Sequence, residues 1–235
     1  MTSRNRLFIG ISGLILTLSA IFASCDAYAQ VNDHQYIKKK ITAKGNCKNL
    51  AMTCEGGELA IFGSNGWSTY GCPDKLVDAL EELNGESLEI IDVVLTEKGE
   101  WLILCEQNII RYSSIPNRLR SEIDQFISHG ETLTSVSFDD NGQWAVTSPN
   151  YFGASSDAIL DWIDSGCGTY GTLYSISITN DAMVAVYENG ILTKGKIPVD
   201  LHSAYDRCNF SVRWAKIAGS HWFFSDGKGR YLHSF

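Results

Sequence analysis

Cysteine and histidine are the residues of this sequence that could support covalent or metal chemistry. The five histidines are scattered along the chain, with no HExxH pair on a predicted helix. Cys208 with His202 or His221 is the arrangement that best fits a cysteine nucleophile and its base. GxSxG and P-loop motifs are absent. The sequence therefore predicts no catalytic residue, metal site or cofactor, and leaves a cysteine-dependent enzyme as an alternative.

Two glycine-containing segments have the composition of ligand loops. Gly166, Gly168 and Gly171 surround Cys167, but this stretch follows a predicted helix instead of opening one, so we expect it to end the helix. The segment Asp139–Gly142 contains part of a calcium loop without the glutamate that completes EF-hand spacing. A hairpin turn is the expectation there.

Aromatic residues fall into two groups. Trp101, Trp144 and Trp222 recur at the same strand position, which predicts core packing. A second group comes from turns and short third strands, where exposure is expected, and exposed aromatic side chains often anchor partners. We predict the binding residues from this group, along one rim: Trp67, Tyr112, Tyr151 and Phe152.

An internal repeat positions these residues. Copies of one pattern are offset by 43, 43 and 40 residues, and a degraded fifth copy begins at Trp214. An Asn-led or Asp-led turn follows inside each copy, and prolines recur after three of these turns. The four clear copies begin at Leu50, Val93, Val136 and Ile176, and the prolines are Pro73, Pro116 and Pro198.

Local chemistry predicts the structure of each unit. Alternating apolar residues around a Gly turn indicate a hairpin, and Asn65–Gly66 and Asn189–Gly190 predict type I′ turns into a short third strand. A helix then begins after proline, or after Ser156 as a cap for residues 157–163. In the helix after Pro116, Ile127 is expected to face inward.

The predicted fold class is α+β and β-rich, with about five repeats of strand, strand, short strand and helix, each of 39–43 residues. Tyr36, Ile37 and Ile41 lie at helical spacing, so residues 30–46 are either a leader or the helix that closes the units into a five-bladed propeller-like ring. An open stack is the alternative. The repeat domain spans residues 47–235, with units at about 47–90, 91–133, 134–173, 174–211 and 212–235.

The first 29 residues predict a signal peptide. Arg4 and Arg6 precede the apolar segment Leu7–Ala23, and Ala27–Ala29 provides the small residues before a cut at Gln30. An uncleaved anchor and a lipid anchor at Cys25 are the alternatives. We expect an exported bacterial protein, periplasmic or extracellular, with no transmembrane segment in the mature chain.

Composition limits the partners. The 235-residue chain is 44% hydrophobic and 20% charged. Its net charge of −8 argues against nucleic acid and anionic membranes as partners.

Six cysteines follow residue 29, an even number compatible with disulfides in an oxidising compartment. Cys47 could pair with Cys54 across a hairpin, and Cys167 and Cys208 occupy matching places in neighbouring repeats. At least one disulfide is expected; buried thiols remain the alternative.

The repeat pattern V-x-F/L-x-x-x-G-x-W-x-V, at 136–146 and 93–103, resembles the first hairpin of a propeller blade. With the I-P-x-x-L helix at Ile115–Leu119, the unit is similar to repeats in exported bacterial β-propeller-like proteins of unassigned function. It departs from WD-type propellers, because a helix stands in place of their fourth strand and the Trp-Asp signature is missing. The unit order also resembles a permuted unit of the penteins, some of which modify guanidino groups with Cys, His and acidic residues.

A repeat ring presents a broad and rigid surface, and no catalytic set is assembled in this sequence. The sequence therefore predicts an exported, non-catalytic platform that binds a protein or glycan at the bacterial cell envelope. A pentein-like, cysteine-dependent hydrolase or transferase and a structural component of a secreted assembly are the alternatives. The oligomeric state does not follow from the sequence.

Overall fold

The computed structural model describes residues 34–235. The predicted signal peptide, Cys25 and the first residues of the 30–46 segment lie outside this range. The described helices each precede a three-stranded sheet in the chain. They are α2 (Gln35–Lys44), α3 (Asp74–Glu86), α4 (Asn117–Ser128), α5 (Asp157–Tyr170) and α6 (Leu201–Asp206), with a short 3-10 helix at Glu106–Asn108.

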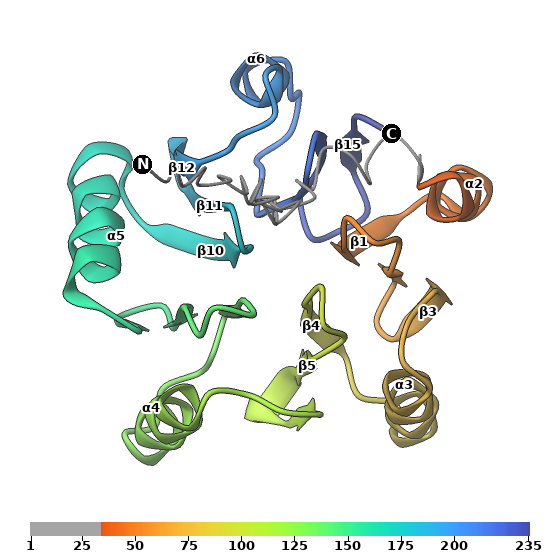
Figure 1. The fold of residues 1–235 in the computed structure, drawn as a ribbon, viewed down its shortest axis with the longest axis horizontal. Helices are drawn as coiled ribbons and strands as arrows, with labels where there is room; N and C mark the ends of the chain where they lie inside the picture. Colours follow the sequence, from red (N-terminus) through yellow and green to blue (C-terminus); the bar gives the residue numbers. More distant parts are fainter. Residues whose placement is uncertain (1–33) are drawn as a thin grey trace, which may run out of the picture.

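The strands of residues 34–235 form five antiparallel sheets of three strands, each in chain order (Figure 1). The first two sheets contain β1 (Cys47–Met52), β2 (Glu58–Phe62) and β3 (Gly66–Tyr70), then β4 (Ile90–Leu95), β5 (Trp101–Cys105) and β6 (Ile110–Tyr112). The third contains β7 (Ser135–Phe138), β8 (Trp144–Thr147) and β9 (Phe152–Ala154). The last two contain β10 (Leu173–Ile178), β11 (Ala182–Tyr187) and β12 (Gly190–Gly195), then β13 (Trp214–Ala218), β14 (His221–Ser225) and β15 (Tyr231–His233). The α+β, β-rich prediction is confirmed.

The third sheet illustrates why the repeat forms hairpins. Val136 pairs with Val146 and Phe138 with Trp144. The Asp139 carboxylate accepts the backbone N–H groups of Asn141 and Gln143, at 2.9 and 2.8 Å, and Gly142 supplies a φ of 79°. The segment with calcium-loop composition is therefore a hairpin turn.

The sheets lie around a common centre with the helices outside them (Figure 1). The first strand of each sheet contacts the first strand of the next, and β13 contacts β1. Five apolar clusters each join two neighbouring sheets to the helix between them. The three repeated tryptophans belong to these clusters and are 3–5% exposed, so their predicted core role is confirmed: Trp101, Trp144 and Trp222.

The N-terminal helix completes this arrangement. The helical spacing that Tyr36, Ile37 and Ile41 predicted is confirmed, because α2 spans all three. Ile37 and Ile41 are fully buried in a cluster with Leu50 of the first sheet and Phe223 of the fifth. The Tyr231 hydroxyl donates to the Ile41 carbonyl at 2.9 Å. Helix α2 is thus packed between the first and fifth sheets.

Several local predictions were wrong. Asn65 and Asn189 do not have positive φ, so neither turn is type I′. Ile127 is 39% exposed, since α4 places Phe126 and Ile123 toward the core instead. The predicted position of Ser156 at the N-cap of α5 is confirmed, although its side chain makes no capping hydrogen bond.

Helix α5 also extends well past the predicted end. It continues through Gly166 and Gly168 to Tyr170, and Gly171, with φ 84°, follows it. Gly166 lies against the ring of Tyr187, where even a Cβ atom would come within 2.2 Å of ring atoms. The glycine is therefore a packing feature inside the helix and does not end it. No described helix is both long and apolar enough to cross a membrane.

Candidate functional site

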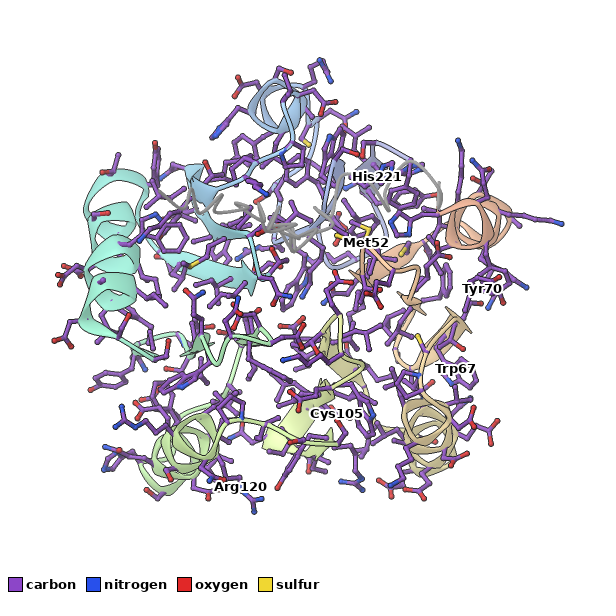
Figure 2. The ribbon with its side chains drawn as sticks, viewed as in Figure 1. Met52, Trp67, Tyr70, Cys105, Arg120 and His221 are labelled. Atoms are coloured by element: carbon purple, nitrogen blue, oxygen red, sulfur yellow. The ribbon has the colours of Figure 1, made fainter. Side chains whose placement is uncertain are left out.

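Three of the four predicted aromatic residues lie on the outer strands of three different sheets, and Tyr151 lies directly before one of these strands. Trp67 on β3, Tyr112 on β6 and Phe152 on β9 are half-buried and pack against three different core clusters. The Arg120 guanidinium lies 5.2 Å from the centre of the Tyr112 ring, and Figure 2 shows Trp67 and Arg120 in separate parts of the periphery. Tyr151 is 61% exposed. Of the four residues, Tyr151 and Phe152 are brought together in one pocket.

This pocket, which we call the α4–β9 pocket, has a volume of about 530 Å³. One wall comes from the second half of helix α4, and the other comes from the loop after α4 and the start of β9. Its lining residues are Glu122, Gln125, Phe126, His129, Glu131, Tyr151 and Phe152. Sequence reasoning identified the two aromatic residues at the start of β9 and missed the helical wall.

A glycine on β9 allows the helical wall to approach the strand. Gly153 is buried and pairs with Val146 in the sheet. A Cβ atom at this position would lie 2.6 Å from Oε1 of Glu122. The Glu122 side chain therefore rests against the strand backbone in space that any larger residue would occupy.

Glu131 is positioned by two of the asparagines of the repeat. The Asn108 amide donates to the Glu131 carbonyl at 2.8 Å, and the Asn108 side-chain oxygen accepts the Leu133 N–H at 2.8 Å. The Asn150 amide lies 3.3 and 3.4 Å from the two carboxylate oxygens of Glu131. These bonds hold the loop after α4 beside Tyr151.

The lining of the α4–β9 pocket combines two acidic side chains with aromatic rings. Glu122 and Glu131 are half-buried, and Lys and Arg are absent from the lining. The ion pairs found among residues 34–235 use other acids: Glu58, Glu86, Glu89, Asp92, Asp124, Asp181 and Asp226. Aromatic faces carry partial negative charge, so the two carboxylates and the aromatic rings of the lining favour a cation, and His129 and Gln125 complete the lining.

A second polar constellation occupies the centre of the molecule. The fully buried Asp92 carboxylate accepts the Lys216 ammonium at 2.8 Å, the Ser135 hydroxyl at 2.9 Å and the Asn49 amide at 3.1 Å. The backbone N–H groups of Val93 and Val136 complete its contacts. Since its partners come from four sheets, this carboxylate joins the inner strands and offers no open position for a ligand.

The repeat contained a signal for this centre. Asn49, Asp92 and Ser135 are separated by 43 residues and each precedes an apolar copy of the pattern. A polar residue in that phase is unexpected on a buried strand. Lys216 does not belong to this series of positions, so only the tertiary structure shows that it joins the centre.

Three histidines that are scattered in the sequence meet between the first and fifth sheets. Nδ1 of His34 lies 2.8 Å from Oε1 of Glu58, and the other carboxylate oxygen accepts the Ile37 N–H at 3.0 Å. The His34 and His221 rings are 5.1 Å apart, and His221 lies beside α2 in Figure 2. Burial lowers the pKa of His233, which stacks on Phe235. Within residues 34–235 no group of His, Cys, Asp and Glu is arranged to hold a metal ion.

Burial lowers the thiolate fraction of the five free cysteines. Burial raises the pKa of Cys47 to about 12 and those of Cys72, Cys105 and Cys208 to about 11. Such thiols are protonated at neutral pH, whereas the thiolate is the reactive form. Nε2 of His202 contacts the Thr193 hydroxyl, and the Cys208 thiol donates to the Ala204 carbonyl.

Five of the six cysteines within residues 34–235 are free: Cys47, Cys72, Cys105, Cys167 and Cys208. The suggested pairing of Cys47 with Cys54 is therefore not formed, and Cys167 and Cys208 are not paired either. No two of these six cysteines are paired with each other. The expected disulfide therefore remains a prediction.

Comparisons with known proteins leave the family of this chain open. No family model matches the sequence, and no curated protein matches it. Among solved structures, the C-terminal domain of gp131 from bacteriophage phiKZ aligns with a TM-score of 0.39 at 10% identity. The alignment covers 66% of this chain and 53% of that chain, so this chain spans about half of that domain.

Proposed function

We propose that this chain is an exported bacterial protein whose units close into a five-bladed propeller-like ring similar to the repeats of other exported proteins. The contact of β13 with β1 and the packing of α2 between the first and fifth sheets support closure. The basic start, apolar segment and Ala27–Ala29 support export and cleavage before Gln30. A closed arrangement leaves no uncovered sheet face at either end of the set of units.

The ring acts as a non-catalytic platform that binds a protein or glycan at the cell envelope. The α4–β9 pocket is the observation that carries this proposal, because it gathers Tyr151, Phe152 and two carboxylates in one accessible hollow. Binding sites commonly combine aromatic walls with a few polar groups in this way. The raised pKa values of the thiols favour binding over cysteine-dependent catalysis.

Capture from the envelope tests the binding function. The immobilised protein is exposed to solubilised envelope of the source bacterium, and the retained protein or glycan is identified and titrated back. We expect saturable binding that Tyr151→Ala weakens at least about tenfold. Tyr70→Ala, which removes another exposed tyrosine at 54% exposure, is the matched control and should leave binding unchanged. Equal affinity of Tyr151→Ala and the unchanged protein would contradict a role for this pocket.

Alkylation separates the platform from the cysteine enzyme. A pKa of about 11 in place of 9.0 leaves roughly 100-fold less thiolate at neutral pH than in an ordinary cysteine. Iodoacetamide should therefore modify Cys72 and Cys208 about 100-fold more slowly than a free thiol. The rate should rise about tenfold per pH unit until the pH approaches 11. Rapid modification of one cysteine near neutral pH would support the hydrolase or transferase instead.

A further inference from the structure

The α4–β9 pocket has the chemistry of a site for an organic cation. We propose that it binds a primary ammonium group at the end of an alkyl chain, such as a lysine side chain or a free diamine. This inference rests on the proposed binding function and names the chemical class of its ligand. The alkyl chain would lie along Phe126, Tyr151 and Phe152, with the ammonium group between Glu122 and Glu131.

The carboxylates decide between a cation and a neutral ligand. A neutral sugar stacked on Tyr151 would hydrogen-bond to Glu122 or Glu131 and leave both charges uncompensated in a half-buried pocket. An ammonium group donates three hydrogen bonds and offsets this charge. It is also attracted to the faces of the aromatic rings. Both parts of the lining therefore favour the same ligand.

The neighbouring unit shows that the pocket is not a general product of the repeat. There, the ring of Tyr170 at the end of α5 lies so close to Gly190 that a Cβ atom would come within 2.3 Å of it. Tyr170 and Trp162 both pack against the core cluster of that unit. The corresponding end of α4 carries His129 and Gly130, which leave the hollow open.

Gly153 offers a test that changes no charge. Alanine at this position would bring its Cβ atom within 3.0 Å of Oε1, Cγ and Cδ of Glu122. The flexible Glu122 side chain must then move away from β9. Gly153→Ala should consequently weaken ammonium binding while the net charge of the protein stays the same.

The experiment titrates the purified protein with 1,5-diaminopentane and with Nα-acetyl-lysine methylamide, by calorimetry and by NMR shifts of the pocket residues. 1-Pentanol and an N-acetylglucosamine oligomer are the neutral comparisons. Glu122→Gln and Glu131→Gln should each weaken diamine binding about tenfold, and Gly153→Ala about fivefold. Glu188→Gln, in the corresponding turn of the fourth sheet, removes one exposed charge elsewhere and should change affinity less than about twofold. Tighter binding of the lysine derivative than of the diamine would identify a polypeptide as the source.

Three results would overturn the proposal. Equal weakening by Glu188→Gln and Glu122→Gln would show attraction by overall charge, without a site. Binding of the sugar oligomer at Tyr151, with no response to the diamine, would leave the platform function intact and exclude the ammonium ligand. If no probe binds and Tyr151→Ala also retains envelope capture, both the ammonium ligand and the platform function at this pocket are excluded.

Discussion

The third unit, α4 with its sheet β7–β9, and the fourth unit, α5 with β10–β12, fill the same space in opposite ways. Each of these two units is a helix with the sheet after it, whereas the units predicted from the sequence ended with their helix. In the fourth, Gly166 on the helix faces Tyr187 at the end of β11. At the equivalent positions of the third unit, forty residues earlier, helix α4 carries Phe126 and the end of β8 carries Thr147. Both side chains are buried. Large and small residues have exchanged places between helix and strand, and the core remains filled in both units.

The outer ends of these two units differ in what fills them. Helix α5 has 14 residues and packs on both β11 and β12, and β12 has six residues. Helix α4 has 12 residues and packs mainly on β8, and β9 has three. The shorter elements leave the α4–β9 pocket at the place that Tyr170 occupies in the fourth unit. One repeat therefore produces core in one copy and a candidate site in the next.

The largest expected effect is the loss of Tyr187 from the filled unit. Its ring is 1% exposed, and its hydroxyl donates to the Ile163 carbonyl at 2.9 Å. Tyr187→Ala should lower the free energy of unfolding by about 3–5 kcal/mol, measured by urea denaturation. Tyr151→Ala in the open unit should change it by less than about 0.5 kcal/mol, since that ring is mostly in solvent. Similar losses in the two variants would remove the distinction between core and site.

Two glycines of α5 sharpen the same comparison with a smaller change. Gly166→Ala should destabilise the protein by about 1–3 kcal/mol, because its Cβ atom meets the Tyr187 ring at 2.2 Å. At Gly168 a Cβ atom would have no neighbour within 4 Å, so Gly168→Ala should stabilise the helix by about 0.5–1 kcal/mol. Thermal unfolding of both variants measures the difference, and the same sign of change in both would contradict the close packing of Gly166 on Tyr187.

A smaller effect than that of Tyr187→Ala is expected at the outer end of the fourth unit. Tyr170 is half-buried over Gly190, so Tyr170→Ala should cost about 1–2 kcal/mol in the free energy of unfolding. This value lies between those of Tyr187→Ala and Tyr151→Ala, and urea denaturation of the three variants measures it. A loss as small as that of Tyr151→Ala would mean that Tyr170 does not fill the space that is open in the third unit.

The sequence predicted the order and approximate position of the strands and helices, but it misplaced the end of helix α5. Prolines and alternating apolar residues located the hairpins and helices, since these signals are local. The end of α5 was misplaced because glycines usually terminate helices, whereas Gly166 is required by Tyr187, 21 residues further along. Two of the four aromatic residues predicted to bind a partner, Tyr151 and Phe152, line the pocket, but Glu122 and Glu131 gave no local signal of their own.

By itself, the amino-acid sequence determined the period of the repeat, the order of strands and helix within it, and the apolar residues that form the core, because all three follow from spacings of a few residues. The tertiary structure decided which distant residues meet. Lys216 reaches Asp92 across 124 residues, and His34 contacts Glu58 and His221 at the place where α2 packs on the fifth sheet. It also decided that one unit is open and its neighbour filled, since that depends on how well side chains from separate elements fill the space between them.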